Sequence, residues 1–428
     1  TDGIEAFMDR YSNSCREVAQ GGRRGALMIS LSVHHPQIRD FIRIKRDLSR
    51  VTGANISIRL TEEFMCAVRG GDPINLRFPV DTKEQPIVEE WVSAKELWHE
   101  IVESAHAAAE PGLLFWDTAK RMTPSDIYEA EGFGSTSTNP CGEIILSPYD
   151  SCRLMLINLT SFVKNAWDAN AEFDFSHFGE IAQKAQRLMD DMIDLEIEKI
   201  DKILAKIKED PEELEVKQPE INLWNKVKAQ AVNGRRTGLG ITGIGDALAM
   251  LNIRYGSKAS IRMTETIYKS LAVNSYVSSM IMAKERGAFT VHDPSREEDH
   301  PFLDRIFDAI DETELLQGVM VERLASRAWN HRWGRRNIAN TTTAPAGSVS
   351  VLTQTTSGIE PAFMLHYTRR KKINPNDADA SVDFVDDLGD KWSEFSVYHH
   401  GFAQWMNALL LNTETEETDA LIAMSPYA

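Results

Sequence analysis

The stretch STSTNPCGEIILSPYDSC, residues 135–152, holds two of the four cysteines of the chain. Cys141 stands between Pro140 and Gly142, and a second thiol follows at Cys152. Ser, Thr and Gly precede Cys141 and the apolar run EIIL follows it, so the pattern predicts a loop tip that leads into a strand. Functional groups are concentrated on loops of this kind.

The residues around Cys141 suit one-electron chemistry. A thiol can yield a thiyl radical that removes hydrogen from carbon, and the carboxylate of Glu143 can take the proton from a neighbouring hydroxyl. Asn139 can hold the same substrate by hydrogen bonds. Residues 148–150 predict a turn, so Cys141 and Cys152 can face each other across a hairpin. One thiol can then begin the reaction while the other supplies reducing equivalents.

Other interpretations of these cysteines stay open on the residues alone. A loop cysteine is often a small, partly buried side chain and nothing more. A zinc site needs about four nitrogen or sulfur ligands, and no His or Cys pair stands close by, so no metal ligands are assigned. A simple dithiol exchange site usually carries C-x-x-C, which is absent here.

Composition narrows the classes of protein to consider. The 428 residues are 42% apolar and 26% charged, as in ordinary globular proteins, and the formal charge of -17 argues against binding to nucleic acid or anionic membrane. The first residues lack the pattern of a signal peptide, and no apolar run approaches the roughly 20 residues of a membrane span. A cytoplasmic protein with reduced thiols is therefore expected.

Local patterns predict helices and strands in alternation. A strand is expected in GALMISLS and another at Asn55 to Arg59, followed by a helix capped by Thr61. Further helices are expected at residues 94–109, about 178–197, 258–286 and 312–328. Residues 198–230 mix charges of both signs, which predicts a solvated helical excursion interrupted at Pro211 and Pro219.

NPCGE followed by CRLMLINL resembles the finger loop of the large catalytic subunit of ribonucleotide reductases. Four other blocks resemble the same family in the same order: QGGRRGALMISLSVHHPQIRDFIRIK (20–45), ANISIRLTEEFM (54–65), RRTGLGITGIGDALA (235–249) and TTTAPAGSVSVLTQTTSGIEPAF (341–363). The resemblance implies an α/β fold, the ten-stranded barrel of the family. Residues 1–428 would form one incomplete barrel domain, with the finger loop inserted through its middle.

The resemblance also implies roles for the residues of the finger loop. Cys141 would be the thiyl-radical cysteine that removes the ribose 3′ hydrogen, Glu143 the base on the 3′ hydroxyl, and Asn139 a hydrogen-bonding partner of the ribose hydroxyls. Cys152 would be one of two thiols that reduce the 2′ position. The implied activity is reduction of ribonucleotides, preferentially diphosphates, to deoxyribonucleotides for DNA synthesis, with a thioredoxin-type reductant.

Two further segments match binding loops of the family. Residues 343–350 match the substrate-phosphate turn, where exposed backbone N–H groups at a helix start can hold an anion, although Ala346 stands in place of the usual Thr. The expected substrate contacts are Pro140, Gly142, Ala344, Pro345, Ala346, Gly347, Ser348 and Val349. Residues 46–53 fall where the family has the loop that transmits the effect of a bound dNTP or ATP to the substrate base. Asp47, Ser49 and Arg50 are the candidate contacts in this loop. A plain turn or solvated loop is the alternative for each segment.

The close spacing of Cys141 and Cys152, the GRRTGLGITGIGD block and YTRRKKINPND resemble the adenosylcobalamin-dependent class. Adenosylcobalamin is therefore the expected radical source, with a metal-containing partner subunit as the alternative.

The chain also departs from the family pattern. A complete reductase has another redox cysteine upstream of the QGG block, and neither Cys15 nor Cys66 matches it. We therefore expect a central piece from a split, intein-interrupted or incomplete gene, unable to turn over alone. The missing segments would be supplied in trans or by the full-length chain, which is expected to form a homodimer. The alternative is an inactive or assembly-dependent nucleotide-binding piece.

Overall fold

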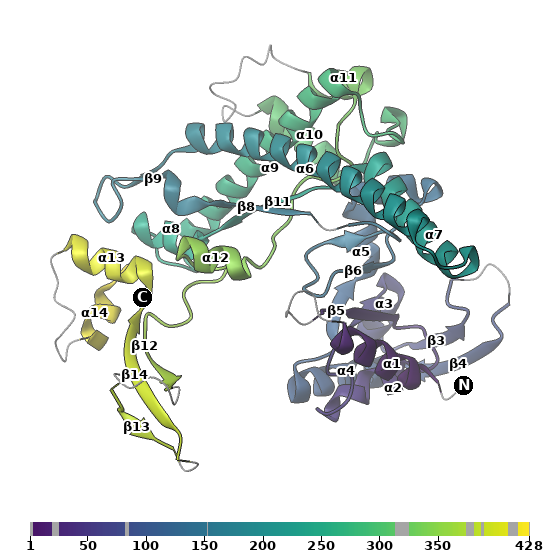
Figure 1. The fold of residues 1–428 in the computed structure, drawn as a ribbon, viewed down its shortest axis with the longest axis horizontal. Helices are drawn as coiled ribbons and strands as arrows, with labels where there is room; N and C mark the ends of the chain where they lie inside the picture. The colour runs from purple at the N-terminus through teal and green to yellow at the C-terminus, as the bar shows by residue number, and fades with distance from the viewer. Residues whose placement is uncertain are drawn as a thin grey trace.

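A computed structural model describes residues 3–18, 25–81, 85–151, 153–312, 325–373, 381–386, 389–409 and 418–427. Figure 1 shows an N-terminal lobe and a C-terminal unit on either side of a central lobe, along which the helices α6 and α9 run. Across these residues, no helix combines the length and the apolar character that a membrane crossing requires.

The N-terminal lobe is built on a parallel sheet with the order β1-β2-β5. Its strands are β1 (Met28–Ser32), β2 (Asn55–Leu60) and β5 (Gly112–Phe115). The helices around it are α1 (Ile4–Glu17), α2 (Ile38–Arg43), α3 (Glu62–Gly70), α4 (Ala94–Ala108) and α5 (Trp116–Met122), with 3-10 turns η1 (Ile44–Arg46) and η2 (Pro124–Glu131). An antiparallel hairpin of β3 (Pro73–Phe78) and β4 (Val88–Ser93) completes the lobe.

Local sequence rules account for these elements. Ile56, Ile58 and Leu60 alternate along β2 and are buried in the core of the lobe. The Thr61 hydroxyl accepts a hydrogen bond from the Phe64 N–H at 3.1 Å, which confirms the predicted cap of α3.

The stretch 135–152 begins with a short antiparallel hairpin, the finger hairpin, of β6 (Ser137–Thr138) and β7 (Ile145–Leu146). Cys141 lies in the tip between these strands, which confirms the predicted loop tip leading into a strand. The hairpin follows the N-terminal lobe in the chain and precedes the first strand of the central lobe.

The central lobe contains a parallel pair of β8 (Leu154–Asn158) and β11 (Gly238–Thr242), with a parallel bridge from Leu239 to Thr341. Its helices are α6 (Phe175–Glu209), α7 (Leu214–Gly234), α8 (Ile244–Met250), α9 (Lys258–Arg286), α10 (Pro301–Glu312), α11 (Ser326–Trp333) and α12 (Gly347–Thr353). Smaller elements are η3 (Leu159–Phe162), β9 (Val163–Lys164), β10 (Glu172–Phe173) and η4 (Pro294–Arg296). Strands β8 and β11 share an apolar core with α6, α8 and α9.

The helix predictions in this lobe are correct in part. The helix expected at 178–197 is longer and forms α6, while α9 has the predicted bounds. The excursion 198–230 is the end of α6 and most of α7, with a break at Pro211 as predicted. The break predicted at Pro219 is wrong: this residue lies inside α7, and the helix continues through it. A helix was also expected at 312–328. Residues 313–324 lie outside the described residues, while α10 ends at residue 312 and α11 starts at residue 326.

The C-terminal unit is an antiparallel sheet with the order β12-β14-β13. Its elements are β12 (His366–Lys372), β13 (Phe384–Val385), β14 (Lys391–Tyr398), α13 (His400–Ala408) and α14 (Thr418–Met424). The unit is joined to α8 through buried Asp246, which contacts His399 Nε2 at 2.6 Å and accepts a hydrogen bond from the Tyr427 hydroxyl at 2.7 Å.

The expected ten-stranded barrel is not closed within the described residues. Their parallel strands form one three-stranded and one two-stranded sheet, and neither sheet closes on itself. Five strands spaced about 4.8 Å apart cover only part of the circumference of a ten-stranded barrel. The α/β class is confirmed, whereas a closed barrel is not.

Candidate active site

The tip of the finger hairpin is organised by Asn139. The Asn139 carbonyl accepts from Gly142 N–H at 3.0 Å, and its side-chain oxygen accepts from Ile144 N–H at 3.0 Å. The Asn139 amide nitrogen donates to Glu143 Oε2 at 2.6 Å. One side chain thus sets both the turn and the position of the carboxylate, and Asn139, Cys141 and Glu143 lie together in this turn. Their roles in catalysis stay predictions.

Cys141 lies at the exposed end of this turn. Partial burial and the negative charge of Glu143 raise the pKa of the Cys141 thiol. At neutral pH the sulfur therefore keeps its hydrogen. Gly142 adopts a φ of 81°, which favours glycine, and a Cβ built there meets nothing within 4 Å. The space beside Cys141 is open.

Contacts from both lobes hold the finger hairpin. From the N-terminal lobe, the Ser30 hydroxyl lies 2.9 Å from the Ser137 hydroxyl, and Asn55 Nδ2 donates to the Pro140 carbonyl at 3.2 Å. From the central lobe, the Thr342 hydroxyl donates to the Glu143 carbonyl at 2.9 Å. The last bond joins residues 199 positions apart in the chain.

The predicted phosphate turn follows directly after Thr342. Burial alternates along it: Thr342, Ala344 and Ala346 are buried, whereas Pro345 and residues 347–349 are exposed. Gly347 begins α12, and a Cβ built on it meets nothing within 4 Å. The buried alanines therefore fix the segment while the first backbone groups of α12 face open space.

The chain after the finger hairpin is fixed by a buried ion pair. Asp150 Oδ2 accepts from Arg236 Nε at 2.6 Å, and both side chains are at most 4% exposed. Arg153 pairs with Glu196 of α6 and donates to the Arg236 carbonyl at 2.9 Å. Cys152 lies outside the described residues, so its predicted place opposite Cys141 stays a prediction.

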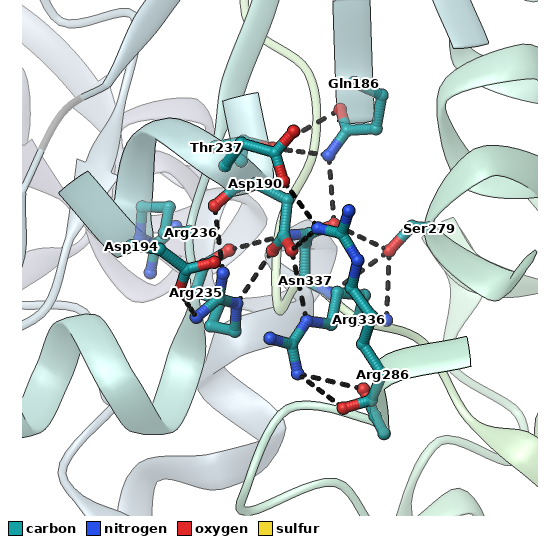
Figure 2. Close-up of polar contacts among 12 residues, drawn as sticks. Gln186, Asp190, Asp194, Arg235, Arg236, Thr237, Ser279, Arg286, Arg336 and Asn337 are labelled. Atoms are coloured by element: carbon teal, nitrogen blue, oxygen red, sulfur yellow. Dashed lines mark hydrogen bonds and ion pairs between the residues drawn. The ribbon is translucent and has the colours of Figure 1, made fainter. Parts of the chain in front are cut away.

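Behind this ion pair, a buried polar network is centred on Asp190 of α6 (Figure 2). Asp190 accepts from Arg235 Nε at 2.7 Å, Asn337 Nδ2 at 3.0 Å, Arg336 Nε at 3.2 Å and Arg286 Nη1 at 3.3 Å. Burial by itself raises the pKa of Asp190, but the hydrogen bonds and charges of Arg235 and Arg336 outweigh it and lower that pKa. The network ties α6 to α9 and to the segments before β11 and Thr341.

Two neighbouring carboxylates extend this network. Asp194 accepts from Arg235 at 2.8 Å and Asp191 from Arg286 at 2.6 Å. The three aspartates converge closely enough to hold an ion, yet each already faces a guanidinium. Their arrangement is that of a structural ion-pair network.

The predicted effector loop is fastened to α1. Arg50 pairs with Glu5 at 2.7 Å and Asp9 at 2.5 Å, so its guanidinium is engaged. Asp47 accepts from both the backbone and the hydroxyl of Ser49, and these hydrogen bonds lower the pKa of Asp47. The loop runs into Asn55, whose side chain reaches the finger tip at Pro140. Effector contacts of Asp47, Ser49 and Arg50 stay predictions.

Residues 1–391 match the profile of the family described as "Ribonucleotide reductase, barrel domain". The chain belongs to this family. Vitamin B12-dependent ribonucleoside-diphosphate reductases resemble it: that of Mycobacterium tuberculosis is 31% identical over 86% of this chain and 43% of the relative, and that of Thermoplasma acidophilum is 29% identical over 86% and 39%. The ribonucleoside-diphosphate reductase subunit alpha of Chlamydia pneumoniae is 23% identical over 85% and 35%. The chain thus spans less than half the length of these relatives.

Within this ribonucleotide reductase domain, sequence reasoning missed the residues that position the finger. Arg236 and Asp190 lie in or before recognised blocks, yet their partners are distant in sequence. The doubled arginines at 235–236 and 335–336, followed by small or polar residues, were the available signal. Two adjacent arginines in segments that are otherwise buried require carboxylate partners.

Proposed function

We propose that this chain is the catalytic core of an adenosylcobalamin-dependent reductase that converts ribonucleoside diphosphates to deoxyribonucleotides. The observation that carries the proposal is the finger tip, where the Asn139–Glu143 hydrogen bond lies beside a protonated Cys141 thiol. Thr342 joins this tip to the turn at 344–349. A ribose and its phosphates can thereby be held by two segments that already contact each other.

The chemistry begins with loss of the hydrogen atom from the Cys141 sulfur. The resulting thiyl radical removes the ribose 3′ hydrogen, and Glu143 accepts the 3′ hydroxyl proton. Cys152 and a second thiol supply two electrons and two protons and become a disulfide: one proton leaves with the 2′ hydroxyl as water, and the other hydrogen replaces the hydroxyl on the 2′ carbon. Glu143 returns its proton to the 3′ oxygen. Cys141 then returns its hydrogen to the 3′ carbon. Asn139 orients Glu143 and the ribose hydroxyls through these steps.

The substrate phosphates would bind at the turn before α12. The first turn of a helix carries unpaired N–H groups, and exposed Gly347 lets an anion approach the backbone. Ala346 is buried and has no hydroxyl, so binding would depend on backbone donors of residues 347–349. Pro140, Gly142 and the exposed Pro345 would flank the substrate.

Adenosylcobalamin, when bound beside Cys141, would supply the radical chemistry that starts the cycle at this thiol. The residues present fit this source, because Cys141 is exposed, holds a protonated thiol, and borders open space at Gly142. The B12-dependent relatives support it as well. A radical delivered by a metal-containing partner subunit is the alternative, motivated by the subunit-alpha relative.

The remaining parts of the cycle would come from outside this chain. The relatives are more than twice as long as the matched region, which supports a working enzyme with further segments, in one polypeptide or in trans. Those segments would supply the partner of Cys152, the rest of the ten-stranded barrel and a thioredoxin-reducible dithiol. The loop at 46–53 would pass the effect of a dNTP or ATP to the finger through Asn55 and Pro140, within a homodimer.

Two rival functions make different predictions. A simple dithiol oxidoreductase needs a thiolate at neutral pH, whereas the raised pKa of Cys141 disfavours the thiolate. An inactive nucleotide-binding piece would hold nucleotide without ever supporting reduction, even when the missing segments are added.

The deciding experiment is Cys141→Ala in the enzyme assembled from this chain and its missing segments. We expect deoxyribonucleotide formation to fall below detection while ribonucleoside diphosphate still binds. Cys66→Ala is the matched control, since Cys66 is an exposed thiol on α3 and not part of the finger hairpin, and it should keep full activity. Reduction that persists in Cys141→Ala, or loss of nucleotide binding together with activity, would contradict the assigned role.

A further inference from the structure

A polar cavity of about 470 Å³ lies in the N-terminal lobe, at the opposite end of the sheet from the finger tip. Asn55, the first residue of β2, contacts the finger tip at Pro140, whereas Arg59 near the end of β2 lines the cavity. Asn55 and Arg59 are four steps apart along the strand, about 13 Å. Ser32 at the end of β1 and Trp116 after β5 also line the cavity. The carboxyl ends of parallel strands are where α/β sheets place ligands.

The guanidinium of Arg59 is the unusual group in this cavity. Its Nε atom is buried and has no hydrogen-bond partner. Its Nη1 donates to the neutral carbonyl of Thr136 at 3.3 Å, and the group lies 5.3 Å from the centre of the Trp116 ring. Burial lowers the pKa of Arg59, opposed by the charge of Asp81, with which it forms no ion pair. Arg59 as a whole is half-buried, and among the described residues no carboxylate pairs with it, so its partial removal from water is not offset by an ion pair.

Other arginines of the chain show the contrast. The fully buried arginines of the described residues each pair with a carboxylate: Arg153 with Glu196, Arg235 with Asp190, Arg236 with Asp150 and Arg335 with Glu297. Each of those four guanidinium groups contacts a carboxylate, whereas the Arg59 side chain lines the cavity.

The other charges around the cavity are largely engaged. Asp117 accepts from the Glu62 N–H at 2.7 Å, Glu129 lies 3.7 Å from Lys120, and Arg77 lies 3.6 Å from Glu63. His34 hydrogen-bonds through both ring nitrogens, to Asn75 and Thr61. Arg59 and the exposed Asp81 therefore determine which ligand charge the cavity prefers. Of these two residues, only Arg59 has a buried donor without a hydrogen-bond partner.

We propose that this cavity binds a small oxyanion, the phosphate or carboxylate group of a metabolite, through the Arg59 guanidinium. The fork of a guanidinium matches the two oxygens of either group. Asp81 opposes the anion and sets a moderate affinity. The site is separate from the phosphate turn at 344–349 and does not depend on the reductase proposal.

The test is calorimetric titration of the 428-residue chain with inorganic phosphate and, separately, with acetate at constant ionic strength. We expect Arg59→Gln to weaken binding at least about tenfold, since a hydrogen bond to a charged group contributes roughly 1.5–3 kcal/mol. Arg59→Lys, which keeps the charge without the fork, should be intermediate. Asp81→Asn should tighten binding several-fold, because it removes the opposing charge. The tighter binder of the two probes identifies the ligand class.

Arg121→Gln is the matched control, because this exposed arginine on α5 lies outside the cavity and already pairs with Glu62. It should leave the affinity unchanged. If phosphate binds at the 344–349 turn instead, Arg59→Gln and Asp81→Asn will both bind phosphate as tightly as the parent chain. That result would overturn the proposal. Absence of any phosphate or acetate binding by the parent chain would overturn it too. If Arg59→Gln does not fold, Asp81→Asn and Arg59→Lys carry the test.

Discussion

At the finger tip, the reactivity of Cys141 depends on whether its sulfur keeps the hydrogen. Burial of the thiol and the nearby Glu143 carboxylate both disfavour the thiolate, so the folded protein holds a hydrogen-atom donor. Asn139 keeps the carboxylate in place through its 2.6 Å hydrogen bond. A nucleophilic cysteine would have needed the opposite environment, a nearby cation or a helix N-terminus.

This environment predicts the pH dependence of alkylation. The pKa of Cys141 is raised on folding, so its reaction with iodoacetamide should reach half its maximum at higher pH in the folded chain than in urea. Glu143→Gln removes one of the two causes and should move that midpoint to lower pH. Peptide mass spectrometry separates Cys141 from the other thiols. Glu180→Gln, an exposed residue of α6, is the control, and an unchanged midpoint in Glu143→Gln would refute the assigned cause.

At the scale of elements, the finger hairpin is short and depends on contacts beyond its own two-residue strands. Bonds from Ser30, Asn55 and Thr342 reach it from both lobes. Its turn needs a residue with positive φ, which Gly142 provides. The position of Cys141 therefore depends on one glycine and on anchors distant in the chain.

Gly142→Ala should destabilise the chain by about 1 kcal/mol, because an alanine in the left-handed region is strained even where space is free. Gly347→Ala is the matched control: space is equally open there, without a positive φ, and it starts α12. It should be neutral or slightly stabilising. Urea unfolding followed by circular dichroism measures both, and equal losses in the two variants would show that strain is not the cause.

At the scale of the whole molecule, the lobes are held around the finger by buried polar groups more than by a continuous sheet. The network of Asp190 ties α6 and α9 to the segments that enter β11 and reach Thr341. The Asp150–Arg236 pair fixes the chain just after the finger. Loss of one member leaves buried charges unpaired, which costs far more than a surface pair contributes.

Asp190→Asn should therefore lower the free energy of unfolding by about 3 kcal/mol. Asp191 forms a half-exposed pair with Arg286, so Asp191→Asn should lower it by less than about 1 kcal/mol. The folded pKa of Asp190 is below its unfolded value, so its contribution is present above the unfolded pKa and is lost as pH falls through the folded one. Urea titrations near pH 7 and in acid measure both effects. A similar loss in the two variants would contradict the role of the network.

Much of the local structure and the finger residues could be predicted from the sequence. Asn139, Cys141 and Glu143 are close in the chain, so one turn had to bring them together. The cap at Thr61 and the bounds of α9 follow from short-range rules of hydrogen bonding and periodicity. The break expected at Pro219 was wrong, because α7 continues through this proline.

The tertiary structure alone decided which distant groups meet. The Thr342–Glu143 bond, the Asp150–Arg236 pair and the network of Asp190 join segments tens to hundreds of residues apart. No local pattern encodes such a partner, since a buried charge requires a counter-charge without specifying which one. The partnerless Nε of Arg59 is recognisable for the same reason, because its burial and the lack of a carboxylate partner among the described residues are properties of the packed chain.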